Sequence, residues 1–385
     1  MVQLPENKKR KIVLRKTNQK ALFLSIQLPN RSLIIHVIND LSLGGAELLL
    51  INTLKLLPEY EHIVVYLFAG KDLAEKFNDQ NVELICLHHK GWRSIFSSAR
   101  KLKTIIKKRK PALIHSHLFE STICARLAVP ASVPLVSTLH SLYSKDAFEK
   151  NQKSVWAEKF TLKRRHNIIG VSKYVLNDYL KFIAFKGERF VLYDFLPDNF
   201  FDLRPPESSA GQLKCIAIGN LKEVKNYNYL LEIFLNLQNK NITLDIYGEG
   251  NLRNKLQEKI DQLGLPVVLK GFAPDTRSLF KNYDLFIQAS VYEGFGLSVI
   301  EAMASGTPVL LSDIPVFHEI SNDLAHFFPL QDSRRAAELL YCLNDNEKKR
   351  NQYIEKAYDH CREKYSEHIY KNKLLEIYSH ILLKH

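Results

Sequence analysis

From residue 32 onward, short apolar runs alternate with stretches in which apolar residues recur every three or four positions. Six runs rich in β-branched residues predict buried strands, and the stretches between them, such as 46–57 and 94–108, predict helices. Strands and helices in strict alternation are typical of a parallel sheet that helices cover on both faces. The strands predicted in this half are 33–38, 62–68, 82–87, 112–115, 135–139 and 168–171.

A second series of the same kind follows residue 211. The segment DLRPPESSAG (202–211) separates the two series, and its prolines, serines and lack of apolar period predict a linker. We therefore expect two doubly wound α/β domains facing each other across a cleft, where ligands meet the carboxyl ends of the strands. The second series predicts strands at 213–218, 243–247, 266–269, 284–288 and 308–311 and helices at 227–237, 252–263 and 297–305.

The length of the chain supports two domains, because single cores stop growing at about 250–300 residues and this chain has 385. A hydrophobic content of 46% and a charged content of 25% are ordinary for globular proteins. Five cysteines without Cys-x-x-Cys spacing exclude a disulfide framework and a structural zinc site, and they favour a reducing compartment. No apolar run reaches the roughly 18–20 residues of a membrane span, and we expect no signal peptide and a cytoplasmic protein.

The basic surplus of the chain lies in its first half. Residues 1–205 contain 33 Lys and Arg against 18 Asp and Glu, whereas residues 206–385 contain 21 against 23. A nucleic acid, an anionic membrane, an anionic substrate or a solubilising basic tail would each account for this surplus. The stretch 92–110 predicts a basic amphipathic helix, which lies either on an anionic membrane or with its apolar stripe on the sheet.

The stretch SVYEGFGLSVIEAMASGTP (290–308) carries the most chemical information. A turn with Gly294 and Gly296 opens a helix at Leu297, and the free N–H groups of such a helix start bind anions, usually phosphate. Glu293 and Glu301 lie on this turn and one helical turn further on, so both can reach the same place. Carboxylates beside a phosphate are expected to hold hydroxyls, such as those of a sugar and a ribose. The alternative is that Glu293 only charges the helix start and that Glu301 is solvated.

In this glycine-rich setting the chain resembles the retaining glycosyltransferases of family 4, which have the GT-B fold. Glu293 and Glu301 match the E-x7-E pair of that family. Further landmarks follow in the family's order, over roughly residues 32–325. They are GGAE beginning at Gly44, VSTLH ending at His140, GNLKEVKN containing Lys225, and YGEG containing Gly248.

The resemblance implies a role for each matching residue. Glu301 would hold the ribose hydroxyls of a nucleotide sugar, and Glu293 would hold the hydroxyls of the donor sugar. Lys225 would neutralise the departing diphosphate, and His140 would approach the sugar from the first domain. The resemblance thus makes Glu293, His140 and Lys225 catalytic. The donor-binding residues that it implies are Gly44, Gly45, Asn220, Lys225, Gly248, Gly294, Phe295, Gly296, Leu297, Ser298 and Glu301.

The resemblance also implies an architecture. Residues 1–30 would form a basic, flexible extension, 31–205 an acceptor-binding Rossmann-like domain, 206–362 a donor-binding Rossmann-like domain, and 363–385 a helix crossing back to the first domain. Members of this fold work without a divalent metal, and no Asp-x-Asp motif argues for one here. We therefore expect neither a metal nor another cofactor. His115 and His117 lack further ligands nearby in the sequence, so we expect them to pack or to line the acceptor site.

The implied function is retaining transfer of a hexosyl unit from a nucleotide-diphosphate sugar, with UDP favoured over GDP. The acceptor would be a glycan or a lipid-linked glycan of surface polysaccharide synthesis, handled on the inner face of the cytoplasmic membrane and not on nucleic acid. Two alternatives stay open, a nucleotide-sugar epimerase of the same architecture and a non-catalytic protein that binds anionic lipid or nucleic acid.

Three positions depart from the family pattern. Asn220 stands where the family usually has arginine, so a neutral amide replaces a bidentate cation beside the diphosphate. Asp194 stands where asparagine is common, and the segment PVFHEI (315–320) lacks the usual glycines. These departures predict a divergent donor site.

Overall fold

The computed structural model describes residues 32–385 apart from 43, 71–72, 79–81, 150, 202–211, 238–240 and 274. The N-terminal extension (1–30) and the linker (202–211) expected from the sequence lie outside the described residues. The chain divides into two compact units. The first comprises the described residues up to Gly170 together with Tyr179–Leu192 and Lys371–His385, and the second comprises Val171–Asp178 and Tyr193–Tyr370.

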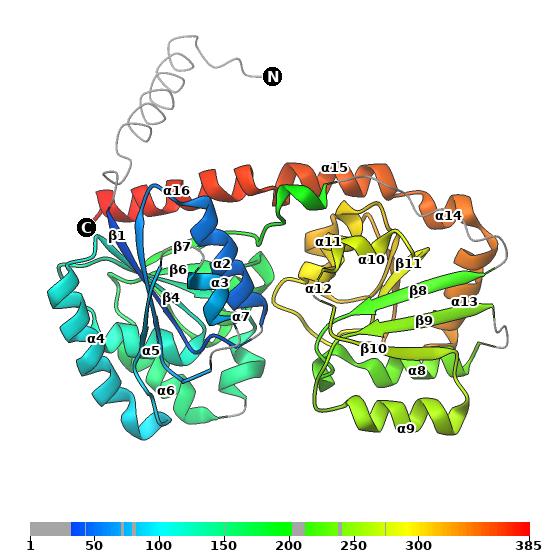
Figure 1. Cartoon of the computed structure of the whole chain (residues 1–385), viewed down its shortest axis with the longest axis horizontal. Coiled ribbons are helices and arrows are strands. Elements are labelled where there is room, and N and C mark those ends of the chain that lie inside the picture. Colours follow the sequence, from blue (N-terminus) through cyan, green and yellow to red (C-terminus); the bar gives the residue numbers. More distant parts are fainter. Residues whose placement is uncertain are drawn as a thin grey trace, which may run out of the picture. The chain divides into compact units, whose positions relative to one another are not determined.

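The first unit is built on a seven-stranded parallel sheet with the strand order β3-β2-β1-β4-β5-β6-β7 (Figure 1). The inner strands β1, β4 and β5 are buried almost throughout, because helices cover both faces of the sheet. The strands are β1 (Leu33–Ile38), β2 (Glu61–Tyr66), β3 (Glu83–Cys86), β4 (Leu113–His117), β5 (Leu135–Leu139), β6 (Asn167–Gly170) and β7 (Glu188–Val191). The helices that begin before β7 are α2 (Gly45–Leu56), α3 (Ala74–Asn78), α4 (Ile95–Arg109), α5 (Phe119–Ala128), α6 (Gln152–Thr161) and α7 (Lys173–Phe182).

Helix α4 answers one question that the sequence leaves open. Its apolar stripe, which includes Ile95, Leu102 and Ile106, is buried in the core of the first unit. Its basic side chains, from Arg100 to Arg109, are exposed. The amphipathic pattern of this helix is therefore explained by packing on the sheet.

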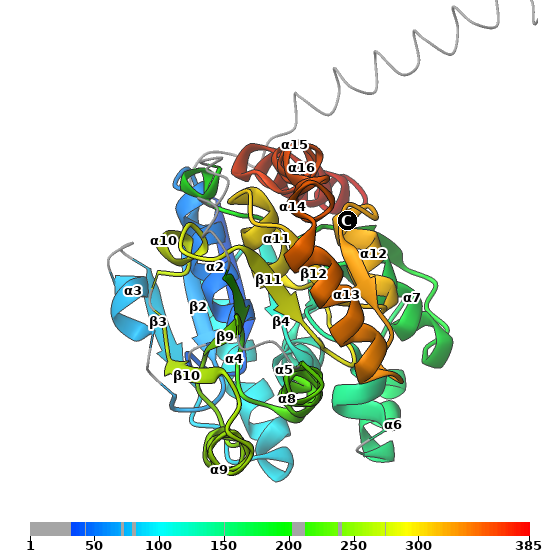
Figure 2. The same cartoon turned by 90° about the vertical axis from the view of Figure 1, so that its right-hand side faces the viewer.

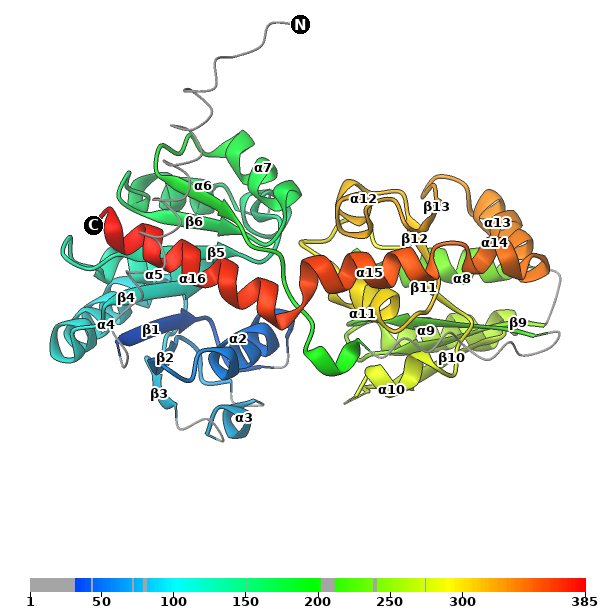
Figure 3. The ribbon, with the colours of Figure 1, turned by 90° about the horizontal axis from the view of Figure 1, so that it is seen from above.

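The last helix of the chain, α16 (Glu367–Leu383), belongs to the first unit from Lys371 onward. It buries Leu374, Ile377, Tyr378 and Ile381. Figure 3 shows α16 crossing over β4 and β5, and the hydroxyl of Tyr378 lies 2.7 Å from Nδ1 of a histidine on β4. The C-terminal helix thus completes one face of the first sheet.

The second unit has a six-stranded parallel sheet with the order β10-β9-β8-β11-β12-β13. Within this unit, Figure 2 shows α8 and α9 at the bottom and α11, α14 and α15 at the top. Its strands are β8 (Leu213–Ile218), β9 (Ile242–Tyr247), β10 (Val267–Gly271), β11 (Leu285–Gln288), β12 (Val309–Ser312) and β13 (His326–Phe328). Its helices are α8 (Tyr227–Leu235), α9 (Arg253–Leu263), α10 (Arg277–Phe280), α11 (Leu297–Ala304), α12 (Pro315–Ser321), α13 (Ser333–Asp345), α14 (Glu347–Asn351) and α15 (Ile354–Tyr365).

Both sheets are doubly wound, which confirms the predicted α/β class. The start of α7 belongs to the second unit because its contacts lie there. Ser172 Oγ donates to the carbonyl of Gly294 over 2.8 Å, and the backbone N–H groups of Lys173 and Tyr174 donate to the Glu319 carboxylate over 2.6 and 2.9 Å. The division into units therefore does not fall at a single position in the sequence.

Two further features concern the cysteines and the helices of the described residues. The five cysteines are all free, and three of them (Cys124, Cys215 and Cys361) are buried. Among the helices of the described residues, none is both long enough and apolar enough to span a bilayer.

Candidate functional site

The two motifs of the second half meet at the point where the strand order of the second sheet reverses. From β8 the sheet grows one way to β9 and β10, and from β11 it grows the other way to β12 and β13. In doubly wound sheets, ligands bind beyond the carboxyl ends of the strands at this switch point. The loop after β8 carries Asn220 and Lys225, and the loop after β11 carries Glu293 and the glycine turn.

Glu293 is the centre of a polar network at this switch point. Its Oε1 atom accepts three hydrogen bonds, from Lys225 Nζ (2.6 Å), Ser290 Oγ (2.7 Å) and Gln288 Nε2 (2.8 Å). The Lys225 and Glu293 side chains are only 19% and 13% exposed, so the ion pair is shielded from water and is stronger than a surface pair. The Oε2 atom accepts no hydrogen bond from any residue that the structure describes, which leaves it available to a ligand.

Gln288 and Ser298 fix the orientation of this network. Ser298 Oγ donates to Gln288 Oε1 over 3.0 Å, so the amide nitrogen of Gln288 is turned toward Glu293. Sequence reasoning named Ser298 but did not select Gln288. The available signal was a polar residue at the end of an otherwise apolar strand, DLFIQ, directly before the motif.

The glycine turn has a backbone that only glycine adopts easily. Gly296 is the N-cap of α11 with φ of 111°, in the region that L side chains rarely occupy. A Cβ atom there would lie 3.1 Å from side-chain carbons of both Phe317 and Ile320 on α12. The segment 315–320 thus packs directly against the turn. The N–H groups of Leu297 and Ser298 are left for a ligand, because those of Val299 and Ile300 already donate to the Gly296 carbonyl.

Gly248 holds the loops after β8 and β9 in close contact. A Cβ atom on Gly248 would lie 2.0 Å from the carbonyl oxygen of Gly219, which no adjustment of a side chain relieves. The aliphatic part of Lys225 passes beside Gly219, with Cε 3.2 Å from the place of a Cβ atom there. The Asn220 side chain is exposed beside them. Close backbone packing therefore sets the place from which Lys225 reaches Glu293.

Glu301 lies on α11 and is half-buried. Thr276 Oγ1 donates to its Oε2 atom over 3.1 Å. Burial raises the pKa of Glu301 to about 7, and Asp275 adds to the rise while the Thr276 hydrogen bond opposes it. A carboxyl group that titrates near neutrality is able to change its hydrogen-bonding role within the physiological range.

The remaining predicted residues, Gly44, Gly45 and His140, belong to the first unit. Gly44 is the N-cap of α2 and Gly45 is the first residue of that helix. His140 follows β5 and is half-buried, and its Nε2 atom lies 3.1 Å from Nδ1 of His117. Burial lowers the pKa of His140 to about 4, so its ring is neutral at pH 7.

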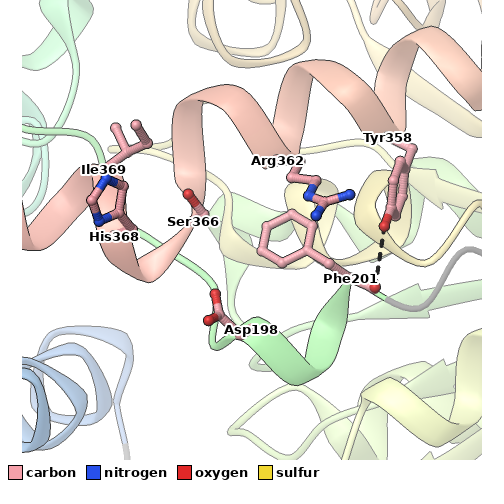
Figure 4. Close-up of a pocket in the computed structure, with 7 residues that line it drawn as sticks. All are labelled: Asp198, Phe201, Tyr358, Arg362, Ser366, His368 and Ile369. Atoms are coloured by element: carbon pink, nitrogen blue, oxygen red, sulfur yellow. Dashed lines mark hydrogen bonds between the residues drawn. The ribbon is translucent and has the colours of Figure 1, made fainter.

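Two of the pockets formed by the described residues, both away from the Glu293 network, bear on the acceptor and on the C-terminal helices. One, of about 480 Å³, lies beside α15 and the start of α16, and Tyr358 donates to the carbonyl of Phe201 over 3.1 Å at its edge (Figure 4). The other, of about 360 Å³, lies at the carboxyl ends of β1, β4 and β5 in the first unit. Its lining includes the aromatic side chains of Trp92, Phe119 and Tyr143.

Two known protein families match this chain, one over most of each unit. The family described as Glycosyltransferase Family 4 matches residues 43–192, and the family described as Glycosyl transferases group 1 matches residues 200–360. A UDP-N-acetylglucosamine–peptide N-acetylglucosaminyltransferase GtfA subunit of Streptococcus parasanguinis is 36% identical over 29% of this chain and 23% of its own length. A poly(ribitol-phosphate) alpha-N-acetylglucosaminyltransferase of Staphylococcus aureus is 28% identical over 42% of this chain and 34% of its own length. The matches thus span about a quarter to a third of these relatives.

The fold of this chain resembles that of a solved structure over nearly the whole length of both chains. The Anabaena protein HepE, in complex with UDP and glucose, superposes with a TM-score of 0.77 at 18% identity. The superposition covers 91% of this chain and all of HepE. Two adjoining family matches, two doubly wound sheets and this superposition agree with one another. The chain belongs to the glycosyltransferases of the GT-B fold, of the family 4 type.

Proposed function

We propose that this chain transfers a hexosyl unit from a UDP-sugar to a glycan or lipid-linked acceptor, with retention of the anomeric configuration. The observation that carries this proposal is the network at the switch point, in which Lys225, Ser290 and Gln288 hold one oxygen of Glu293 and leave the other to a ligand. That free oxygen accepts hydrogen bonds from hydroxyls of the donor sugar.

The diphosphate of the donor is stabilised by the start of α11 and by Lys225. The N–H groups of Leu297 and Ser298 and the positive end of the helix dipole favour the negative charge that develops as the diphosphate leaves. Lys225 keeps a close pair with Glu293 and has two further N–H donors for phosphate oxygens. These groups supply positive potential from the protein itself, so the proposed reaction needs no added metal.

The reaction exchanges one bond at the anomeric carbon for another on the same face of the sugar. The bond from this carbon to the diphosphate oxygen breaks, and a bond to the acceptor oxygen forms. The acceptor proton passes to the departing diphosphate, which is the base closest to it. We propose that His140 contacts the sugar, and that Gly44 and Gly45 bring backbone N–H groups of the first unit to the phosphates.

Glu301 binds the ribose hydroxyls in this proposal. Its carboxylate form accepts two hydroxyl hydrogens, and its position on α11 follows Glu293 by eight residues. Uracil is favoured as the base because the S. parasanguinis relative is named for UDP-N-acetylglucosamine and HepE was solved with UDP.

The acceptor is assigned to the first unit. The aromatic pocket at the carboxyl ends of β1, β4 and β5 offers Trp92 and Phe119 as flat apolar surfaces for a sugar ring. The basic surplus of residues 1–205 suits an acceptor that carries phosphate. The S. aureus relative is named for such an acceptor, poly(ribitol-phosphate).

We also propose that α6 brings the enzyme to an anionic membrane. Trp156 and Phe160 are 74% and 80% exposed, and their spacing of four residues places them on one face of this helix. Lys153 and Lys163 are exposed at the same three-to-four-residue intervals before and after them. Exposed aromatic rings among basic side chains are typical of surfaces that bind the headgroup region of a bilayer.

Sedimentation with vesicles tests this surface. Vesicles with a third of phosphatidylglycerol are expected to bind the wild type, and Trp156→Ala/Phe160→Ala is expected to bind at least about tenfold more weakly. Phe272→Ala removes an aromatic side chain that is 55% exposed in the second unit, and it should bind like the wild type. Equal binding of all three proteins would remove α6 from the proposal.

A thermal-shift panel with UDP, GDP and ADP tests the donor site. A nucleotide at 100 times its dissociation constant stabilises the folded chain by about 2.7 kcal/mol, which such a panel detects. We expect a shift with UDP that Glu301→Gln reduces and that Glu338→Gln, a change of an exposed glutamate on α13, preserves. No shift with any nucleotide would refute the donor site.

The reaction itself is tested by incubating UDP-glucose or UDP-N-acetylglucosamine with a glycan acceptor and measuring UDP release. The anomeric configuration of the product, read by NMR, decides between retention and inversion. An isomerised sugar nucleotide formed without acceptor would replace transfer by epimerisation.

A further inference from the structure

Five histidines of the first unit lie on neighbouring strands of its sheet. The strand order β2-β1-β4-β5 brings together His62 on β2, His36 on β1, His115 and His117 on β4, and His140 after β5. His36, His115 and His117 are buried, with 5% exposure or less, whereas His62 and His140 are half-buried at the two ends. Packing alone does not call for so many polar rings in the interior of a sheet.

Four of these rings form a continuous hydrogen-bonded chain. His140 Nε2 lies 3.1 Å from His117 Nδ1, and His117 Nε2 lies 3.3 Å from His36 Nδ1. His36 Nε2 in turn lies 3.3 Å from His62 Nδ1. The chain ends at the backbone carbonyl oxygen of Leu57, which is 3.0 Å from His62 Nε2.

The carbonyl at the end of this chain determines the direction of every bond in it. A carbonyl oxygen only accepts, so His62 must carry its hydrogen on Nε2 and must accept on Nδ1 if its ring is neutral. His36 then donates from Nε2 and accepts on Nδ1. By the same argument His117 donates from Nε2 to His36 and accepts on Nδ1 from His140. Each neutral ring therefore carries its hydrogen on Nε2.

The rings are neutral because they are removed from water. Burial lowers the pKa of His36, His62 and His117 below its ordinary value, and the neighbouring histidines add to this for His36 and His117. For His62 the Leu57 carbonyl and the nearby Glu59 oppose the shift. A neutral imidazole has one donor and one acceptor nitrogen, which is the condition that the chain requires.

We propose that the Leu57 carbonyl, acting through His62, His36 and His117, holds His140 as the tautomer with hydrogen on Nε2, so that its Nδ1 atom accepts a hydrogen bond from a substrate hydroxyl. His62, His36 and His117 are positioning residues in this proposal, and His140 touches the substrate. The inference rests on the proposed function for the contact between His140 and a sugar hydroxyl, and not for the tautomers of the four rings.

A metal ion is the competing explanation for these histidines. His36, His115 and His117 each offer a ring nitrogen, and these atoms lie within 4.8 Å of one another. However, the His115 and His117 rings are stacked, with centroids 4.2 Å apart and planes at 29°, so lone pairs in the ring planes do not converge on one point. Both nitrogens of His115 are also engaged at 2.7 Å, by Thr138 Oγ1 and Tyr378 OH.

The tautomer of His140 is measured by NMR on the full chain with 15N-labelled histidine, using long-range couplings between ring nitrogens and carbon-bound hydrogens. The His140 signals are assigned by their loss in His140→Gln. We expect hydrogen on Nε2 and a bare Nδ1 in the wild type without ligand. Hydrogen on Nδ1 would overturn the proposal, and this measurement requires no destabilising variant.

His62→Lys tests the transmission along the chain. A lysine ammonium only donates, so it can satisfy the Leu57 carbonyl and donate to His36 Nε2. Every bond of the chain then reverses, and His140 is expected to carry its hydrogen on Nδ1. His88→Lys is the matched control, because His88 is an exposed histidine of the same unit outside the chain. An unchanged His140 tautomer in a folded His62→Lys would show that no direction is transmitted.

Two further NMR measurements distinguish this proposal from a metal site and from a failure of the proposed function. Addition of one equivalent of Zn²⁺ should leave the ring signals in place, and metal-bound signals from His36, His115 and His117 would overturn the chain. The tautomers are read in the free protein and do not depend on transfer. If they are as expected while no sugar nucleotide binds, the proposed function fails and the chain of histidines stands.

Discussion

Asp194 is a carboxyl group that the folded second unit holds in an unfavourable place. It is 6% exposed, and its Oδ1 atom has no hydrogen-bond partner among the described residues. Burial raises its pKa from 3.8 to about 8. At neutral pH the folded chain therefore keeps this group protonated, whereas the unfolded chain ionises it.

This difference makes stability depend on pH. Between about pH 4 and pH 8 the folded state binds one more proton at Asp194 than the unfolded state, so the free energy of unfolding falls as the pH rises. Each pH unit in this window corresponds to about 1.4 kcal/mol. An asparagine at this position does not titrate, so the Asp194→Asn variant lacks this pH dependence in both the folded and the unfolded state. The free energy of unfolding of the variant minus that of the wild type is therefore expected to rise by about 4 kcal/mol between pH 5 and pH 8.

Thermal melting at pH 5, 6, 7 and 8 measures this effect. A change of 1 kcal/mol moves the midpoint of a unit of this size by roughly 2–4 °C, so the gap between Asp194→Asn and wild type should widen by roughly 10 °C. The fixed cost of an unpaired amide shifts all four gaps equally and cancels from the comparison. Asp198→Asn, at an exposed aspartate in the same segment, is the matched control. A gap that stays constant from pH 5 to pH 8 would refute the reasoning.

Three further substitutions follow from the described geometry. Gly248→Ala should abolish the thermal shift with UDP, because its Cβ would lie 2.0 Å from a backbone oxygen, while Gly264→Ala, also at positive φ but with open space around it, should keep the shift. Arg126→Ala leaves a fully buried glutamate unpaired and should cost about 3–5 kcal/mol in urea unfolding, against at most about 1 kcal/mol for Arg109→Ala at an exposed pair. Lys225→Ala should lower the rate of UDP release by roughly 100-fold, and an unchanged rate would exclude a role at the diphosphate.

The strands at the centre of each sheet were predictable from the sequence, and so were the edge strands β3 and β10, but the edge strands β7 and β13 were not. The bounds predicted for 33–38, 135–139 and 213–218 match β1, β5 and β8, because most residues of these strands are apolar and buried. By contrast, β7 and β13 are edge strands of four and three residues with partly exposed side chains. Such strands carry too short a pattern to separate from the turns around them.

The site was predictable where its residues are close in sequence. The glycine turn and the spacing of Glu293 and Glu301 form one local motif, and the structure places that motif at the switch point of the second sheet. The partner of Lys225 was not predictable, because the ion pair joins residues 68 positions apart. The sequence suggested Lys225 as a partner of phosphate, and the structure adds the carboxylate that already holds it.

The histidine chain was even less predictable from the sequence, because its contacts join residues that are far apart in the chain. His115 and His117 were noticed as a pair on one strand, yet His36 and His62 gave no signal of their own. The four rings of the chain come from three strands and a strand end, and only the order of the sheet brings them together. A periodic pattern in one segment does not report contacts between side chains of different strands.

Helix α16 has a consequence for how the protein is made. The first unit is complete only with Lys371–His385, and these residues follow its earlier part by roughly 180 positions. At about 5–20 residues per second, synthesis of that interval takes roughly 10–40 seconds. Until then, the sheet lacks Leu374, Ile377 and Tyr378 on one face, so newly made apolar surface stays open to chaperones and proteases. A truncation before α16 would therefore damage the first unit, most of which was synthesised much earlier.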